Sequence, residues 1–340
     1  MKNEMNISQF NYHLPPERIA QEPLKDRDKS SLLLLHRESG EIEHRRFYQI
    51  LDYLEPGDLL VMNNTRVSAK RLFGKKATGA RVEALLIENT GGNIWNAYVK
   101  PGRRIDIGAE IFFDNGLTAR VTARTEAGGR ALDFGPGEEI AEKIQMQGLV
   151  PLPPYIHTVL KEKERYQTVY AKRPGSAAAP TAGFHFTPEI FRKLKENGVQ
   201  TAEVTLNVGI ATFRPVRTEN IADHEMHTEH ISITPEAADI INSARGRIIS
   251  VGTTTARVLE SAAVAKRQVA PVDMETNLFI TPGYDFKIID GLITNFHMPK
   301  STLLILVSAF AGRENILHAY NQAAERGYRF LSFGDAMFII

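Results

Sequence analysis

A histidine between two phenylalanines is the first place in this sequence where chemistry could occur. His185 lies between Phe184 and Phe186, and a Thr-Pro pair directly after them predicts a helix start. Imidazole changes charge near neutral pH and flanking rings exclude water, so this side chain could transfer a proton. A packed, hydrogen-bonded core histidine has the same sequence surroundings. The residues alone leave both interpretations open.

Polar side chains also follow predicted strands, at the point where each strand ends. The apolar run 248–251 leads into Gly252, Thr253 and Thr254, where a helix begins. Free backbone amides at a helix start bind carboxylates and phosphates, although ordinary threonine capping explains the same residues. Because ligands gather at strand ends in α/β domains, the same argument selects a second set of candidates: Asn64, Arg66, His297, Lys300 and Asp335.

Three histidines spaced three residues apart could be the ligands of a metal site. His224, His227 and His230 would lie on one side of a helix, but a strand or loop would scatter them. The next residues, 231–234, alternate as in a strand, which argues against a helical triad. We therefore expect no metal here, and hydrogen-bonding roles for His227 and Glu229.

The composition excludes several classes of function. The 340 residues contain no cysteine, which removes disulfides, thiolate metal sites and cysteine nucleophiles. Lys plus Arg (41) nearly cancels Asp plus Glu (40), so a polyanion must be bound by a local basic patch. The start lacks a hydrophobic signal core, and no apolar run approaches the roughly 20 residues that span a bilayer. We expect a cytoplasmic protein without membrane contact.

Turn residues predict a small β domain within the chain. Between Arg81 and Phe134, short strand-like runs alternate with turns rich in glycine and asparagine, including an Asn-Gly pair at 115–116. This pattern predicts an antiparallel barrel. A helix-like stretch at 138–147 and a proline run at 151–154 mark its end. We place this domain at residues 70–150.

The remainder, residues 1–69 plus 151–340, alternates between helix and strand signals. Threonine caps followed by proline predict helix starts at Thr187 and Thr234. The sequence as a whole predicts a layered α/β main domain with an inserted antiparallel barrel. The other predicted elements are a helix at 47–54, buried strands at 247–251 and 287–293, and helix ends at Gly198, Gly246 and Gly327.

A basic stretch leads into the predicted barrel. Residues 66–82 contain six basic side chains and no acidic one. Such a stretch neutralises phosphates while a splayed base enters a pocket, although a solvated charged face has the same composition. The candidate RNA-binding residues are Lys70, Arg71, Lys75, Lys76, Arg103 and Arg104.

Long ordered runs across nearly the whole chain resemble one known family. The chain is similar to the S-adenosylmethionine (AdoMet):tRNA ribosyltransferase-isomerases of queuosine biosynthesis. The runs that carry the resemblance are 14–15, 19–23, 57–61, 63–67, 146–156, 166–170, 178–183, 251–254, 294–297 and 329–338.

The resemblance implies a reaction in which AdoMet is consumed as a ribosyl donor. AdoMet is then a co-substrate, and no true cofactor is expected. The ribosyl group is transferred and isomerised onto 7-aminomethyl-7-deazaguanine at the wobble position of a tRNA with a GUN-type anticodon. The products are epoxyqueuosine, adenine and methionine. The resemblance also implies an α/β body with an inserted β-barrel, and we expect a monomer.

This chemistry suggests roles for the candidate residues. A proton must leave the carbon next to the sulfonium, for which His185 or His227 is the hypothetical base. Departing adenine needs a proton donor, for which Glu229 or Asp335 would serve. The methionine end needs an anion site, for which the candidates are Gly252, Thr253, Thr254 and Lys300. The remaining candidates for contact with AdoMet or the target base are Asn64, Arg66 and His297.

One departure from the family pattern bears on activity. Where relatives usually read Leu-His-Val-Gly and then Gly-Thr-Phe, this chain has Asn207 and Ala211 in place of the histidine and a glycine. An amide cannot shuttle protons. Asn207 leaves open a non-catalytic tRNA-binding protein on the same scaffold. The histidine triplet leaves open a metal-dependent hydrolase.

Overall fold

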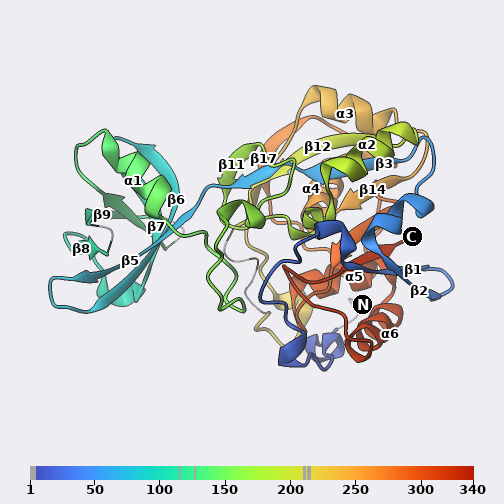
Figure 1. The fold of residues 1–340 in the computed structure, drawn as a ribbon, viewed down its shortest axis with the longest axis horizontal. Coiled ribbons are helices and arrows are strands. Elements are labelled where there is room, and N and C mark those ends of the chain that lie inside the picture. The colour runs from blue at the N-terminus through green and yellow to red at the C-terminus, as the bar shows by residue number, and fades with distance from the viewer. Residues whose placement is uncertain (1–4, 115, 126–127, 210–211, 213–215) are drawn as a thin grey trace.

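The computed structural model describes residues 5–114, 116–125, 128–209, 212 and 216–340, which form a layered body and a separate barrel (Figure 1). The body is built on a nine-stranded sheet, and six strands close the barrel. The chain enters the barrel from the body and returns to it afterwards. The fold class predicted from the sequence, an α/β body with an inserted antiparallel barrel, is confirmed.

The main sheet has parallel strands at its centre. In spatial order its strands are β17 (Val272–Thr276), β13 (Glu229–Ile233), β12 (Gln200–Leu206), β3 (Leu59–Asn63), β14 (Ile248–Val251), β18 (Gly291–Asn295), β19 (Ala336–Ile339), β1 (Ser31–Leu35) and β2 (Ile42–Arg46). The four neighbours β12, β3, β14 and β18 run parallel, so their carboxyl ends lie at one edge of the sheet. Ligands bind at this edge in α/β domains.

Helices cover both faces of the sheet because its central strands are apolar on both sides. In β3, Leu59 and Val61 face one core, while Leu60 and Met62 face the other. The first core is covered by α3 (Pro235–Asn242), α4 (Thr253–Ser261), α5 (Thr302–Ala311) and α6 (Arg313–Glu325), and the second by α2 (Pro188–Glu196) and the 3-10 helix η4 (Phe47–Tyr53). Among the described residues, no helix is both long and apolar enough to cross a bilayer.

The barrel has a hydrophobic core of its own. Its strands, in order around the barrel, are β10 (Arg130–Asp133), β7 (Ile94–Lys100), β6 (Arg81–Gly91), β5 (Lys70–Lys76), β8 (Glu110–Phe113) and β9 (Thr118–Arg124). Inward side chains alternate along β6, and helix α1 (Glu139–Gln147) adds Ile140 and Ile144. The strands appear where turn residues predict them, while β5 forms from the stretch interpreted only as basic. The predicted turn residues Asn115, Glu126 and Ala127 lie outside the described residues.

Short elements complete the body. β4 (Thr65–Val67) pairs in parallel with β11 (Arg173–Ser176), next to the point where the chain enters the barrel. A hairpin is formed by β15 (Ala263–Ala265) and β16 (Gln268–Val269). The remaining described 3-10 helices are η1 (Ile7–Phe10), η2 (Pro16–Arg18), η3 (Arg27–Lys29), η5 (Gly102–Arg104), η6 (Lys163–Tyr166), η7 (Thr181–His185) and η9 (Ile221–Asp223).

Two local predictions are wrong for identifiable reasons. The strand expected at 287–293 begins only at Gly291, because the backbone amides of residues 287–289 donate to the buried Glu260 carboxylate at 2.9–3.2 Å. Gly246 does not adopt the left-handed conformation of a helix cap. A Cβ atom there would lie 2.6 Å from the carbonyl carbon of Gly57, so a close backbone approach requires this glycine. Gly198 and Gly327 have the expected positive φ, 73° and 83°.

Candidate active site

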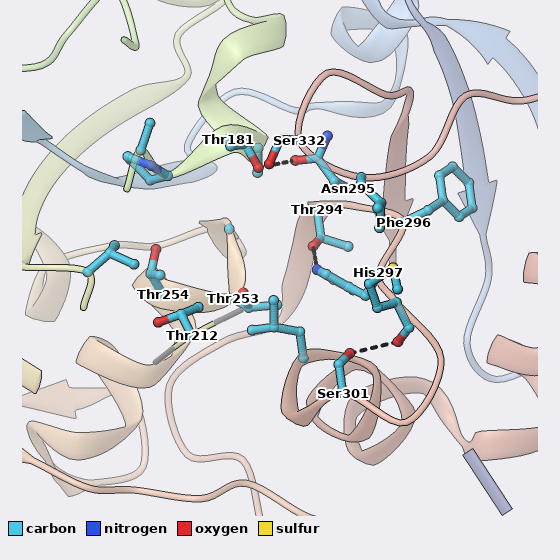
Figure 2. A pocket seen from close by; sticks show the side chains of 18 of the residues that line it. Thr181, Thr212, Thr253, Thr254, Thr294, Asn295, Phe296, His297, Ser301 and Ser332 are labelled. Carbon is cyan, nitrogen blue, oxygen red and sulfur yellow. Dashed lines mark hydrogen bonds between the residues drawn. The ribbon is translucent and has the colours of Figure 1, made fainter. Parts of the chain in front are cut away.

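A cavity of about 160 Å³ opens at the carboxyl ends of β14 and β18 (Figure 2). The polar side chains of its described lining are hydroxyls, the Asn295 amide and the His297 imidazole, with no Asp, Glu, Lys or Arg among them. The lining residues are Tyr155, Ala179, Pro180, Thr181, Ala182, Val208, Thr212, Gly252, Thr253, Thr254, Thr294, Asn295, Phe296, His297, Met298, Pro299, Ser301, Leu303, Leu331 and Ser332. Segments far apart in the sequence therefore meet at one site, as the strand-end argument predicts.

The turn between β14 and α4 forms one wall of the cavity. Gly252 has φ 95°, a conformation that favours glycine, and it turns the chain from the strand into the helix. Thr253 and Thr254 line the cavity from the first turn of α4, where backbone amides lack intrahelical acceptors. Figure 2 shows both threonines on the side of the cavity opposite Thr294 and His297. These amides are suited to an anionic group of a ligand.

His297 presents a hydrogen-bond donor to the cavity. Its ring nitrogen Nδ1 lies 3.0 Å from the Tyr320 hydroxyl, which already accepts the backbone N–H of His297 at 3.2 Å. The buried tyrosine hydrogen needs an acceptor, and Nδ1 is the one within reach among the described residues, which favours the tautomer with the proton on Nε2, 3.2 Å from the Thr294 hydroxyl. Burial lowers the pKa of His297 to about 3, so the ring is neutral at physiological pH.

His185 lies behind the cavity wall and contacts it through Asn295. The Nδ2 of Asn295 lies 3.4 Å from the carbonyl oxygen of Asp335, which can only accept, and 3.2 Å from Nε2 of His185. His185 Nε2 must then accept, so its proton lies on Nδ1 and is donated to Ser30 Oγ at 2.7 Å. Asn295 Oδ1 in turn accepts from Thr181 Oγ1 at 2.9 Å, as drawn in Figure 2.

The series of hydrogen bonds Ser30–His185–Asn295–Thr181 fixes which groups donate. Because the Thr181 hydrogen is used by Asn295, the Thr181 oxygen can only accept from a ligand. Burial, with repulsion from Arg27 and Arg329, lowers the pKa of His185 to about 3. His185 is thus a neutral residue that orients the cavity wall, and this position favours a positioning role over that of the base.

The two buried histidines should make the protein unstable in acid. In each, the folded-state pKa is depressed below the unfolded value near 6.5, so their neutral state stabilises the fold above that pH. This stability is lost as pH falls from 6.5 towards 3, since the unfolded chain binds the protons first. Between roughly pH 7.5 and pH 5, each histidine should lower the free energy of unfolding by about 2 kcal/mol. Urea unfolding at both pH values measures this loss of stability. In His185→Asn, the free energy of unfolding should depend less steeply on pH than in the wild type. An equally steep pH dependence would contradict the prediction.

A third histidine, His227, adjoins the cavity through Thr212. His227 Nε2 lies 3.4 Å from both Thr212 Oγ1 and Glu229 Oε1. Glu229 Oε1 also accepts from the Gly209 backbone amide at 3.0 Å and from Thr212 Oγ1 at 2.9 Å. With Nε2 turned to the carboxylate, Nδ1 of His227 has no partner among the described residues.

Glu229 is ionised despite its burial. Burial alone would raise its pKa, but the hydrogen bond from His227 and the charge of Arg257 outweigh it and lower the pKa below the ordinary value. Its second oxygen accepts from Arg257 in α4, which is itself 4% exposed. An ionised Glu229 cannot donate a proton, so its position favours support of His227 over the acid role.

Several other predicted site residues lie outside the cavity lining. Asp335 accepts the backbone amides of Ser31 and Arg329, both at 2.8 Å, and burial raises its pKa. These contacts favour an anchoring role over the proton-donor role. Lys300 has φ 57° in the loop before α5 and does not line the cavity.

The polar residues that follow β3 are also engaged away from the cavity. The Asn64 side chain donates to Glu203 at 3.1 Å and accepts from Thr205 at 2.8 Å. Arg66 forms an ion pair with Glu164. Neither side chain belongs to the described lining of this cavity, and a substrate contact through either one stays a prediction.

The residue that departs from the family pattern is also outside the lining. Asn207 Oδ1 accepts from Thr65 Oγ1 at 3.0 Å. The side chain covers Gly175, where a Cβ atom would lie 2.7 Å from Nδ2 of Asn207. Ala211 lies outside the described residues. Asn207 therefore supports the loop beside the cavity.

The histidine triplet is dispersed. His224 stacks edge-on against Phe279, His227 contacts Glu229, and His230 pairs with Asp273 at 2.5 Å. Within the part of the chain that the structure describes, no group of three His, Cys, Asp or Glu side chains could hold a metal ion. The three rings have separate partners, as strand geometry predicts for residues 229–233.

The predicted RNA-binding residues differ in exposure. Lys75, Arg103 and Arg104 are exposed on the barrel, and Lys76 Nζ donates to the Arg104 carbonyl at 2.7 Å. Arg71 pairs with Glu83 at 2.9 Å. Lys70 is buried, and this burial lowers its pKa, so it is not available to a phosphate.

Sequence reasoning missed most of the hydroxyl lining. Thr181, Thr212, Thr294 and Ser332 carry no signal of their own, because isolated hydroxyl residues are common in loops. Arg257 had a readable signal, since it is the one basic residue in the first turns of an otherwise small and apolar helix.

Comparison with known proteins gives consistent matches over the full chain. Residues 7–339 match the family described as "Queuosine biosynthesis protein". Proteins from Carboxydothermus hydrogenoformans and Moorella thermoacetica, both named S-adenosylmethionine:tRNA ribosyltransferase-isomerase, are 54% and 53% identical over 99% of this chain and all of their own. The crystal structure of a Thermotoga maritima S-adenosylmethionine tRNA ribosyltransferase is 40% identical, with a TM-score of 0.55 over 98% of this chain and 100% of that one.

Proposed function

Because the chain belongs to the queuosine biosynthesis protein family of S-adenosylmethionine:tRNA ribosyltransferase-isomerases, we propose that AdoMet reacts in the cavity at the ends of β14 and β18. Full-length identity of 49–54% to three such enzymes is the observation that carries the function. The enzyme class and AdoMet as co-substrate, both predicted from the sequence, are confirmed. The two alternatives, a non-catalytic tRNA-binding protein and a metal-dependent hydrolase, are not favoured.

The finer identity of the RNA substrate is part of the proposal. The acceptor is 7-aminomethyl-7-deazaguanine at the wobble position of a tRNA with a GUN-type anticodon. The products are epoxyqueuosine in tRNA, adenine and methionine. The enzyme acts as a monomer in the cytoplasm.

His227, which adjoins the cavity through Thr212, is the base that removes the proton next to the sulfonium. Its Nε2 faces the ionised Glu229, and its Nδ1, which has no partner in the described part of the chain, can accept a proton. A protonated His227 would be paired with this carboxylate, as in other histidine–carboxylate dyads. Glu229 thus supports the base, and Arg257 holds Glu229 in place.

His297 assists the departure of adenine. A neutral imidazole with its proton on Nε2 can exchange its Thr294 partner for a leaving nitrogen and stabilise the charge that develops there. The amides of Thr253 and Thr254 receive the carboxylate of the methionine end. His185 orients Asn295 and Thr181, whose oxygen accepts from an N–H or O–H group of the substrate.

The barrel contributes to RNA binding. We assign residues 70–150 to a separate domain because its strands close on themselves around their own core. Exposed basic residues on this domain, chiefly Lys75, Arg103 and Arg104, are placed to contact phosphates.

One assay tests the proposed function. The protein is incubated with AdoMet and a tRNA that carries the aminomethyl base, and adenine and RNA mass are measured together. We expect one adenine per modified tRNA, and none with a tRNA that carries guanine. Retention of tRNA without adenine release would indicate a binding protein, and chelator-sensitive hydrolysis would indicate the metal enzyme.

A further inference from the structure

A second hollow lies on the outer wall of the barrel, apart from the AdoMet cavity. Its volume is about 480 Å³, and it shares no lining residue with the cavity. It lies where β5 meets the segment after α1, since Arg71 and Leu149 exchange backbone hydrogen bonds at 2.8 and 3.0 Å. Its lining residues are Arg71, Leu72, Phe73, Asp114, Gln147 and Leu149.

The hollow exposes an unusual set of groups to solvent. Phe73 and Leu149 are 45% and 40% exposed, although water disfavours such large apolar surfaces. The planar guanidinium of Arg71 is fixed by Glu83 at 2.9 Å and by the Leu152 carbonyl at 3.3 Å. The Asp114 carboxylate and the Gln147 amide have no side-chain partner among the described residues. An aromatic face, a fixed planar cation and free polar groups are together complementary to a nucleobase.

We propose that this hollow binds an unpaired nucleobase of the tRNA, next to the nucleotide that enters the AdoMet cavity. The inference rests on the proposed function, which supplies tRNA as substrate. The base stacks on Phe73, while the Gln147 amide donates or accepts hydrogen bonds at its edge and the Asp114 carboxylate accepts them. Arg71 closes the opposite side as a flat cation.

Charge on the same face favours RNA as the occupant. Side chains alternate along β5, so Arg71, Phe73 and Lys75 share the outer face. Lys75 pairs across the sheet with Arg81, and both are exposed. Two cations without an ion-pair partner in the described part of the chain, next to an exposed ring, are suited to a phosphate and its base.

The hollow is also within reach of the AdoMet cavity. Leu149 lines the hollow and Tyr155 lines the cavity. They are six positions apart in the sequence, so their Cα atoms lie at most about 22 Å apart. A single anticodon loop can therefore place one nucleotide in each site.

Phe73→Leu tests the proposal, with Phe112→Leu as the matched control. Phe112 is 44% exposed on the outer face of neighbouring β8 but does not line the hollow. Loss of one stacked base should raise the KM for tRNA by roughly 5- to 150-fold in Phe73→Leu. In Phe112→Leu the KM for tRNA should equal that of the wild type. The KM for AdoMet and kcat at saturating tRNA should not change, and Phe73→Trp should retain affinity.

RNA substrates that lack a base at one loop position identify the bound nucleotide. Removal of the correct base should weaken wild-type binding but have no further effect on Phe73→Leu. If the wild type is active and the two leucine variants have equal KM values for tRNA, the hollow does not bind a nucleobase. The proposed function would remain intact. Wild-type protein that releases no adenine would instead refute the function. Self-association that Phe73→Leu abolishes would assign the hollow to a second copy of the chain.

Discussion

Replacing His227 with glutamine should lower the rate of adenine release by about 10²- to 10⁴-fold, the usual contribution of a general base. Glutamine retains a donor towards Glu229 but cannot take up a proton. AdoMet affinity should change little, because glutamine has a similar size and keeps the contact with Glu229. Single-turnover kinetics at saturating tRNA isolates the chemical step from binding.

Proton removal can be measured without the later steps. In D₂O, the wild type should exchange the hydrogen next to the sulfonium for deuterium, whereas His227→Gln should not. His185→Gln is the matched control, since it alters a buried histidine that orients Asn295. It should weaken AdoMet binding and leave the exchange rate at saturating AdoMet intact. The reverse pattern would make His185 the base.

Substituting Arg257 with methionine should destabilise the protein by about 3–5 kcal/mol, because it leaves the ionised Glu229 buried without its partner. The double variant Arg257→Met and Glu229→Gln should recover much of this loss. Glutamine still accepts from the Gly209 amide and the Thr212 hydroxyl. Urea unfolding of the single and double variants gives both values.

The dependence on pH provides a second check on this pair. Glu229 has a folded-state pKa below its ordinary 4.5, so its ionisation stabilises the fold above that pH. The contribution is lost as pH falls through the lower, folded-state pKa. The difference in free energy of unfolding between wild type and Arg257→Met should therefore become smaller below about pH 4.5. A constant difference would show that Arg257 acts by packing alone.

Features that depend on local sequence were predictable. Asn-Gly and glycine-rich turns predict the barrel strands, and threonine caps predict the starts of α2 and α3. The β14–α4 turn was a candidate site because a strand that breaks at glycine exposes amides, and Gly252–Thr254 do line the cavity. These signals come from backbone conformation, which neighbouring residues largely determine.

Roles that depend on tertiary contacts were not predictable. His185 and His297 have similar aromatic or apolar neighbours in sequence, yet only His297 faces the cavity. The protonation of Glu229 depends on Arg257, which is 28 residues away in the chain. Asp335 looked reactive because it is an acid among apolar residues, but two backbone amides satisfy it. No periodic pattern encodes such partners.

The neutral lining of the cavity has a consequence for the reactivity of its substrate. A sulfonium held there meets hydroxyls and amides, with no carboxylate in the described lining to neutralise it. In a poorly polarisable enclosure, an uncompensated positive charge is costly, and loss of the neighbouring hydrogen as a proton converts the cation into an overall neutral ylide. The walls thereby increase the carbon acidity of the substrate before any base approaches it.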